Sequence, residues 1–160
     1  MIDYKHLRET VATGLREYLG VPVIRGNQTA AAPPYPYVTY NVTTIAGANN
    51  GTWQQHEDGI DRLQVKSIWS FSSLSDDWDD SVNNAVRARE WFMHSGRQWL
   101  SERGISVHSA TEITNRDNVL TVDYERKNGF DVVFYVFDEA ESMAAVNGTI
   151  ESVEITHEMN

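Results

Sequence analysis

The amino-acid sequence predicts an α+β fold in which two main helices pack on a mostly antiparallel β-sheet that carries a long projecting β-hairpin. In two long stretches apolar residues recur every three or four positions, which is typical of helices with one buried face. In other stretches apolar and polar residues alternate with a period of two, which is typical of half-buried strands. Runs rich in glycine, asparagine and proline separate these stretches and indicate the turns.

The length and composition are those of a folded globular protein. Of the 160 residues, 41% are hydrophobic and 11% are aromatic, which is too rich in core-forming residues for a disordered chain. A chain of this length forms one compact domain by default. We therefore expect a single α+β domain at residues 1–139 and an acidic C-terminal linker and extended arm at 140–160.

The first helix is predicted at residues 3–19. Gly20 supplies a stop signal, and Pro22 prevents continuation of the helix. A short strand at 23–25 and a loop at 26–34 follow. The apolar residues that define this helix are Tyr4, Leu7, Val11, Leu15 and Tyr18.

An antiparallel hairpin is predicted next. Closely spaced prolines keep the chain extended before a strand at 37–45, in which apolar and polar residues alternate. Residues 46–59 form a long polar connection rich in turn-forming residues, and we expect this connection to be the projecting tip. The return strand is expected at 60–72, where Leu63, Val65, Trp69 and Phe71 share one parity.

The second helix is predicted to begin near Ser75 and to run to Gly104. Four aspartates, at positions 76, 77, 79 and 80, lie in its first turns and suit the positive end of the helix dipole. We expect Gly96 to be the site of any kink. The apolar stripe of this helix consists of Trp78, Val82, Ala85, Ala88, Phe92 and Trp99.

Three further strands are predicted at 105–113, 120–124 and 130–137. The sequence Lys127-Asn128-Gly129 predicts a tight type I′ turn between the last two strands. The strand at 130–137 is apolar on both parities after Asp131, so we expect it to be central in the sheet or covered by a neighbouring chain.

The C-terminal segment carries most of the excess negative charge. The whole chain has 13 basic and 23 acidic residues and a formal net charge of -10, yet residues 128–160 hold seven acids and no Lys or Arg. The negative electrostatic field of these acids repels phosphates, which argues against binding of a nucleic-acid backbone as the main function. The extended segment at 149–157 places Ile150, Val153 and Ile155 among glutamates, and we expect it to dock on its own sheet or on a neighbour's.

The sequence predicts no catalytic residues, no cofactor site and no metal site. Absence of cysteine excludes disulfides, thiolate metal sites and cysteine nucleophiles. No two of the five histidines have the spacing of a zinc-binding helix, and the standard nucleophile and phosphate-loop motifs are absent. We also find neither a signal-peptide pattern nor an apolar run long enough to span a membrane. A small α+β hydrolase or ligand-binding domain built on His56, Asp58 and Asp61, or on the tryptophans, remains an alternative.

Three blocks of residues, in order along the chain, carry a resemblance to a known family. The first is Arg25-Gly26-Asn27 leading into Pro34-Tyr35-Pro36-Tyr37-Val38-Thr39-Tyr40. The second runs from Arg62-Leu63-Gln64 through Ser70-Phe71-Ser72 to the acidic helix start. The third joins Asn115-Arg116-Asp117 to Asp123-Tyr124-Glu125-Arg126-Lys127 and Gly129-Phe130-Asp131-Val132. In this ordered set the chain resembles the neck and tail-terminator proteins of tailed bacteriophages over most of residues 1–139.

The resemblance implies a structural virion protein and not an enzyme. Proteins of this family have an α+β fold and form a ring, commonly of six subunits, at the head–tail junction. The ring terminates the tail tube, joins it to the head-side connector, stopper or adaptor and, in some tails, meets the sheath, while DNA passes through its lumen without specific binding. The resemblance therefore implies a virion protein assembled in the host cytoplasm. A stopper or tail-completion connector protein is the nearest alternative.

Within that ring, several residues are predicted to form interfaces. Trp53 lies in the polar connection without a core partner in its own segment, so we expect Trp53 and His56 to face a partner ring. Tyr35 and Tyr37 are expected near subunit contacts. Ile150, Val153 and Ile155 of the arm are expected to pair with a sheet, and the C-terminal acids are expected to line the channel or an outer face.

Overall fold

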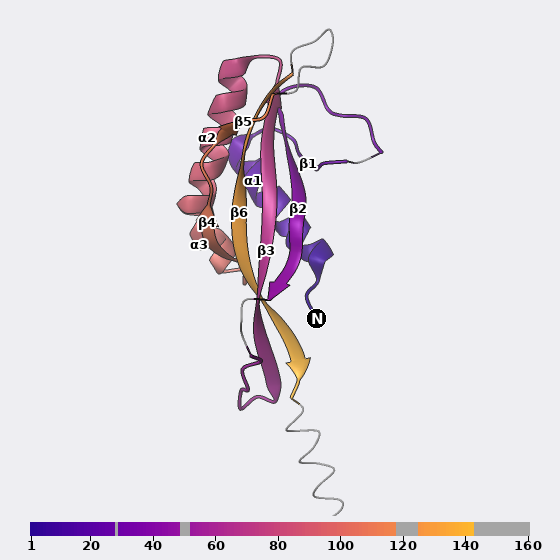
Figure 1. Ribbon diagram of the computed structural model, residues 1–160, viewed down its shortest axis with the longest axis vertical. Helices are drawn as coiled ribbons and strands as arrows, with labels where there is room; N and C mark the ends of the chain where they lie inside the picture. The colour runs from indigo at the N-terminus through magenta and orange to yellow at the C-terminus, as the bar shows by residue number, and fades with distance from the viewer. Residues whose placement is uncertain (28, 49–51, 118–124, 143–160) are drawn as a thin grey trace, which may run out of the picture.

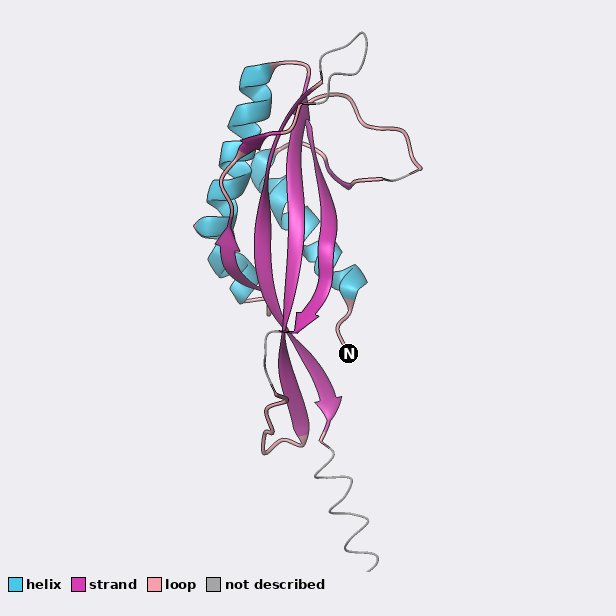
Figure 2. Ribbon diagram, viewed as in Figure 1, coloured by secondary structure: helices cyan, strands magenta, loops and turns pink. Residues whose placement is uncertain are grey.

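The computed structural model describes residues 1–27, 29–48, 52–117 and 125–142, and within them three helices pack on one face of a six-stranded mixed sheet (Figures 1 and 2). The elements in chain order are α1 (Tyr4–Leu19), β1 (Val23–Arg25), β2 (Tyr37–Ala48), β3 (Ile60–Ser75), α2 (Trp78–Met93), α3 (Ser95–Ser101), β4 (Ser106–Ala110), β5 (Thr114–Asn115) and β6 (Arg126–Glu141). The predicted α+β class is confirmed.

The sheet is mostly antiparallel, as expected. Its strand order is β1-β2-β3-β6-β4, and the short β5 also pairs with β6. Only β1 and β2 run parallel among the described strands. The prediction that the last apolar strand is central is confirmed, because β6 lies between β3 and β4. The expected strand at 105–113 is shorter than predicted, since β4 ends at Ala110 and the separate β5 begins only at Thr114. The expected strand at 120–124 lies outside the described residues.

Helix α1 matches its prediction closely because its start and end are encoded locally. The Asp3 carboxylate accepts a hydrogen bond from the His6 amide (3.0 Å), which satisfies one of the free N–H groups of the first turn. At the other end Gly20 adopts a left-handed conformation with φ of 73°. The buried stripe consists of Leu7, Val11, Leu15 and Leu19.

The prediction of one helix from Ser75 to Gly104 is wrong. Asp77 caps α2 by accepting from the Asp80 amide (3.2 Å), and the helix ends at Met93. His94 has φ of -128° and ψ of -102°, outside the helical region. The break lets α3 turn toward α1 and β4, with which it packs.

The expected kink at Gly96 is also wrong. Gly96 is helical and buried in the first turn of α3, and a Cβ atom there would overlap the Trp91 ring. This glycine therefore makes room for an aromatic side chain.

The type I′ turn predicted at Lys127-Asn128-Gly129 is wrong, because all three residues lie inside β6. Asn128 pairs with Ser73, and Gly129 pairs with Ser72. The buried Asn128 side chain donates a hydrogen bond to Ser81 Oγ of α2 (3.0 Å). The pair Asn128-Gly129, which is typical of turns, thus lies in a strand. There the Asn128 side-chain amide has a hydrogen-bond partner, and the lack of a side chain at Gly129 permits the close approach of neighbouring atoms.

The long hairpin expected to project at 46–59 is not confirmed. Strands β2 and β3 do pair antiparallel, and β2 ends with Ala48 opposite Val65. Farther along the connection, Gln54 forms an antiparallel bridge with Arg62, so this part of the chain lies back against β3.

A different pair of strands projects from the body. Residues 60–64 of β3 continue past the end of β2, where they pair with residues 137–141 of β6 (Figure 1). We call this two-stranded extension the ribbon. It carries four acids, Asp61, Asp138, Glu139 and Glu141, and one cationic side chain, Arg62.

The core lies between the helices and one face of β3 and β6. Its centre is a group of fully buried aromatic side chains. The Phe71 and Phe92 ring centroids lie 4.7 Å apart, and those of Trp69 and Phe134 lie 5.3 Å apart in an edge-to-face arrangement. Buried aromatic pairs of this kind stabilise the fold beyond their buried area. They fix α2 to the central strands.

Replacement of Gly129 by alanine should destabilise the fold. A Cβ atom at Gly129 would overlap the carbonyl oxygen of Phe71, and it would lie 2.8 Å from Arg116 Nη1 and 2.9 Å from Ser72 Oγ. We expect Gly129→Ala to lower the free energy of unfolding by about 1 to 3 kcal/mol, measured by urea denaturation.

Gly47→Ala is the matched control for this prediction. A Cβ atom at Gly47 meets its nearest neighbours at 3.5 Å, an ordinary contact. This variant should change the free energy of unfolding by less than about 0.5 kcal/mol. Equal effects of the two substitutions would contradict the close approach inferred at Gly129.

Candidate interaction surface

The sheet has one face covered by helices and one face that no described helix covers (Figures 1 and 2). Since side chains alternate along a strand, the residues between the core positions point to this second face. We call it the uncovered face. Along β3 it contains Gln64, Lys66, Ile68, Ser70 and Ser72, which pair with Phe137, Tyr135, Val133, Asp131 and Gly129 of β6.

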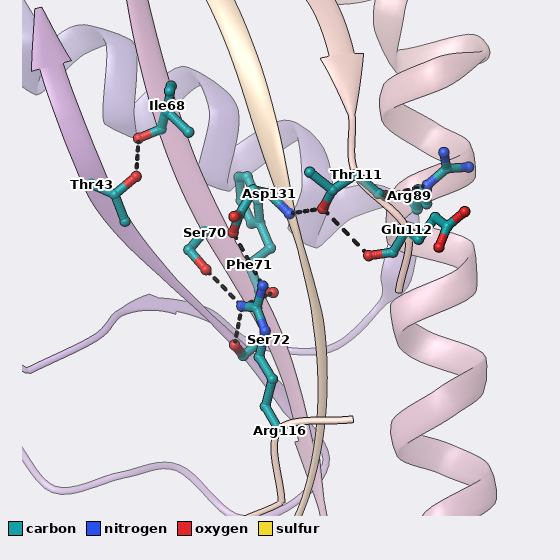
Figure 3. A network of polar contacts seen from close by, with 10 residues as sticks. All are labelled: Thr43, Ile68, Ser70, Phe71, Ser72, Arg89, Thr111, Glu112, Arg116 and Asp131. Atoms are coloured by element: carbon teal, nitrogen blue, oxygen red, sulfur yellow. Dashed lines mark hydrogen bonds and ion pairs between the residues drawn. The ribbon is translucent and has the colours of Figure 1, made fainter. Parts of the chain in front are cut away.

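One half of the uncovered face is held by Arg116, which extends across β6 to β3 (Figure 3). Arg116 Nη1 donates to Ser70 Oγ (2.6 Å) and to Ser72 Oγ (3.3 Å). Its Nη2 forms an ion pair with Asp131 Oδ1 (3.1 Å). We call this group the Arg116 clamp. The guanidinium crosses the sheet directly over Gly129, and this explains why a side chain at that position is excluded.

A second set of hydrogen bonds connects the backbone of Asp131, through Thr111, to helix α2 (Figure 3). The Asp131 amide donates to Thr111 Oγ1 (2.8 Å), and Arg89 Nε of α2 donates to the Thr111 carbonyl (2.8 Å). The chain after β4 is therefore bound both to β6 and to α2. This polar half of the uncovered face is a rigid part of the fold.

Asp117, the residue after the clamp arginine, holds the start of β6. Its carboxylate accepts from the Lys127 amide (2.6 Å), from Arg126 Nη1 (3.2 Å) and from Asn115 Nδ2 (3.3 Å). Burial by itself would raise the pKa of Asp117, but these three donors outweigh it and hold the pKa below its ordinary value. The Asn115-Arg116-Asp117 block thus has a structural role that sequence reasoning did not assign.

The other half of the uncovered face carries an apolar stripe beside Gln64 and Lys66, and we call it the apolar half. Ile68, Val133 and Tyr135 are half-buried there, and Phe137 at the start of the ribbon is 54% exposed. The Tyr135 ring packs edge-to-face on His108 of β4, with centroids 4.9 Å apart. An aromatic and aliphatic stripe of this kind, beside a polar region, is typical of a protein–protein contact surface.

Tyr35 and Tyr37 are brought together at the start of β2. Their rings stack with centroids 5.5 Å apart, and Tyr35 Oη donates to Glu125 Oε1 (2.9 Å). Partial burial, together with Glu125, raises the pKa of Tyr35 to about 12. Tyr35 is 42% exposed and Tyr37 is 6% exposed, so Tyr35 is the ring of this pair that a partner can reach.

The residues expected to face a partner ring lie at the opposite end of the sheet. Trp53 is 42% exposed, and His56 is also exposed. Their neighbour Gln54 pairs with Arg62 in the ribbon, whereas Tyr37 pairs with Leu74 at the far end of β3. The arm residues Ile150, Val153 and Ile155 lie outside the described residues.

The geometry does not assemble the alternative hydrolase site. Asp58 forms an ion pair with Arg62 (2.9 Å), while Asp61 is buried and its Oδ1 has no hydrogen-bond partner within the described residues. His56, Asp58 and Asp61 line neither the cleft beside β2 that is described below nor a smaller one beside Tyr18 and His94. Among the described residues no group of three potential metal ligands is found, and no helix is long and apolar enough to span a membrane.

Sequence reasoning missed two exposed apolar residues of this surface, Ile45 and Phe137. Ile45 in β2 is 60% exposed, although it was expected only to end a strand. The exposure of Phe137 could have been predicted from the sequence. The segment that forms β6 is apolar at both odd and even positions, and only one of these two sets of side chains can face the core.

Substitution of Asp117 by asparagine should destabilise the protein at neutral pH. Asparagine loses the charge that three donors stabilise, so we expect a loss of about 1 kcal/mol. Because the folded pKa lies below the ordinary value of 3.8, this stabilisation is present above pH 3.8 and is lost as the pH falls through the folded pKa. Urea denaturation at several pH values measures the difference.

Glu90→Gln, at an exposed carboxylate of α2, is the control for Asp117→Asn. It should change stability little at any of these pH values. A deficit of Asp117→Asn that persists undiminished in acid would argue against a role for the carboxylate charge.

Comparison with known proteins places the chain in a family. No curated protein matches the sequence. A family model described as phage neck terminator protein matches residues 9–159, and this range includes the Arg116 clamp, the apolar half of the uncovered face and α1 from residue 9 onward. Because the match takes in all but the first eight residues and the last, the whole chain belongs to the phage neck terminator protein family.

Proposed function

We propose that this phage neck protein forms a ring at the head–tail junction, where it terminates the tail tube, joins it to the head connector and lets DNA pass through its lumen. Membership of the family indicates a structural virion component of the neck. Membership of a structural family also argues against an enzymatic function. The ring, its lumen and its partners are our proposal.

The observation that carries the proposal is the apolar half of the uncovered face. A cyclic ring needs two different surfaces on each subunit, each complementary to the other on its neighbour. Ile68, Tyr135 and Phe137 offer one such surface, supported from behind by the packed core. Their exposure in a single chain is explained if a neighbouring subunit covers them. The expected number of six follows from the family resemblance.

The ribbon suits the wall of a channel through which DNA slides. Its four acids and single arginine give it a local net charge of -3, from -4 and +1. Negative charge repels phosphates, so DNA makes few contacts that have to be broken during passage. Arg62 does not reverse this field, because it is neutralised by Asp58 and Glu139 at 2.9 and 3.2 Å.

We assign the proposed partners according to which exposed residues lie at each end of the sheet. Trp53 and His56, beside the ribbon, would face a partner ring or the tail tube protein. Tyr35 and Tyr37, at the opposite end, would lie near subunit contacts. The head-side partner would be a connector, stopper or adaptor protein, and a sheath would be a further partner in a contractile tail. Assembly would take place in the host cytoplasm.

A stopper or tail-completion connector is the second candidate function. It shares the exposed apolar face but would bind the portal–adaptor side and not the tube. Pull-down of the purified chain with each of the two partners separates these functions. Binding to the tail tube protein is expected, and binding to the head connector alone would favour the stopper.

Native mass spectrometry and negative-stain microscopy of the purified chain test the ring. We expect a closed assembly of six subunits that binds the tail tube protein. A chain that stays monomeric at all concentrations and ignores the tube protein would overturn the proposal.

Substitution of Phe137 by aspartate should weaken ring assembly and leave the subunit folded. Phe137 is 54% exposed, so the change removes little core packing, but it would bury a charge at the proposed contact. We expect the concentration at half-assembly to rise about tenfold or more, measured by mass photometry. Unfolding of the monomer should shift by no more than about 0.5 kcal/mol.

The matched control is Val86→Asp on α2. Val86 is 37% exposed and lies on the helical layer, away from the uncovered face. It should assemble like the unmodified chain. Equal weakening by both substitutions would point to a general effect of added charge and not to a contact at Phe137.

A further inference from the structure

A second surface, at the edge of the sheet formed by β1 and β2, has the features of a binding site. An open cleft of about 800 Å³ lies between the first turns of α1, the loop after β1 and the outer side of β2. The residues of this cleft that matter for the argument are Tyr4, Arg8, Arg25, Asn41, Val42 and Ile45. Its lining includes Asn41, the strand partner of Ser70, but none of Ile68, Val133, Tyr135 and Phe137 of the apolar half of the uncovered face.

Two cationic side chains of the cleft have no partner within the described residues. Arg62 and Arg116 form ion pairs, but the side chains of Arg8 and Arg25 have neither a hydrogen bond nor an ion pair in that part of the chain. Unpaired guanidinium groups at the wall of a cleft are suited to bind carboxylates, often with two parallel hydrogen bonds. The cleft therefore favours an anionic occupant.

The backbone beside these arginines favours an extended occupant. β1 pairs only with Val38, Thr39 and Tyr40 of β2. Beyond Tyr40, residues 41–48 have no strand on their outer side among the described residues. An open strand edge binds an extended segment by adding it as a further strand. Ile45, 60% exposed on this edge, adds an apolar contact for the incoming segment.

The sequence of the chain contains a segment with these properties at 149–157. It is nine residues long, against eight in the open edge of β2. Ile150, Val153 and Ile155 provide apolar side chains, and Glu151 and Glu154 provide carboxylates. Residues 143–160 contain no Lys or Arg, so nothing in the segment repels the two arginines.

The direction of the ribbon indicates which copy supplies the segment. The described part of β6 ends in the ribbon, which leads away from the body past the end of β2 (Figure 1). There the Ser142 amide donates to the Gly59 carbonyl (2.8 Å). The last described residues, 137–142, thus run away from the cleft of their own subunit, and this direction favours a neighbouring subunit as the acceptor.

We propose that residues 149–157 of one subunit add as a strand to the outer edge of β2 in a neighbouring subunit. Because side chains alternate along a strand, one glutamate of the segment, Glu151 or Glu154 according to the register, then lies beside Arg8 and Arg25. This inference rests on the proposed ring, because it needs a neighbouring copy. It gives the ring a second contact, distinct from the apolar half of the uncovered face.

Disulfide trapping tests the exchange in the full chain, which has no cysteine of its own and therefore gives no background. Ile45→Cys is made in a chain with one affinity tag, and Val153→Cys in a chain with another. The two are mixed during assembly and oxidised. Ile150→Cys and Ile155→Cys are used in parallel to allow for the register of the added strand. We expect a covalent dimer that carries both tags.

Two controls make the result specific. Val86→Cys, exposed on α2, replaces Ile45→Cys and should give little covalent dimer. Arg8→Gln with Arg25→Gln in the receiving chain should lower the yield of trapped dimer roughly tenfold, because two charge-assisted contacts are lost. Circular dichroism verifies that the variants remain folded.

Three outcomes would overturn the proposal. Trapping within a single chain that carries both cysteines, without dimer between tags, would show that the segment occupies its own cleft. Equal trapping by Val86→Cys would show a non-specific encounter. Unaltered trapping in the receiving chain that carries both Arg8→Gln and Arg25→Gln, together with loss of trapping by the unmodified cleft when a short DNA duplex is added, would show that the two arginines bind phosphate and not the segment. Native mass spectrometry of the same samples shows whether rings form, so failure of the exchange is distinguishable from failure of the proposed ring.

Discussion

The structure depends on the continuous pairing of β3 with β6. Every residue from Ile60 to Ser75 has a partner between Arg126 and Glu141, without a bulge. Other pairs of strands are shorter or have shifts of register. A one-residue slip in this pairing would turn every core side chain to the opposite face. The Arg116 clamp opposes such a slip, since it bonds Ser70 and Asp131 at once.

This one register produces both surfaces on which the proposed function rests. On the core side it aligns Trp69 and Phe71 with the aromatic side chains of β6 and α2. On the other side the same register aligns Ile68 with Val133 and leaves them without a helical cover. The subunit contact proposed here is therefore a direct consequence of how the core is built. Because the ribbon continues the same pairing as far as Glu141, the positions of its acids relative to the core are set by the same register.

The distribution of charge gives the proposed ring two kinds of region. The ribbon and the C-terminal segment are acidic, whereas the side chains of Arg8 and Arg25, beside the open edge of β2, have no partner among the residues that the structure describes. Acidic groups along a channel favour passage of DNA, and acidic groups that meet a basic cleft favour contact between subunits. The same excess of carboxylates can thus serve passage in one place and assembly in another.

The sequence by itself determined the features that depend on local physics. Helix α1, with its cap at Asp3 and its stop at Gly20, and the alternating strand that begins at Tyr37 were predictable because neighbouring residues encode them. The α+β class and the resemblance to neck proteins were also available from the sequence. The expectation that β6 is central followed from its apolar residues on both parities.

Tertiary structure alone decided the features that depend on distant contacts. Asn128 and Gly129 have the local signature of a turn, yet β3 on one side and the Arg116 guanidinium above hold them in a strand. The helix break at His94 and the cleft formed by Arg8 and Arg25 likewise arise where separate segments meet. Local propensities differ by about 1 kcal/mol or less, which is small compared with the packing and hydrogen bonds that a long register such as β3 with β6 imposes.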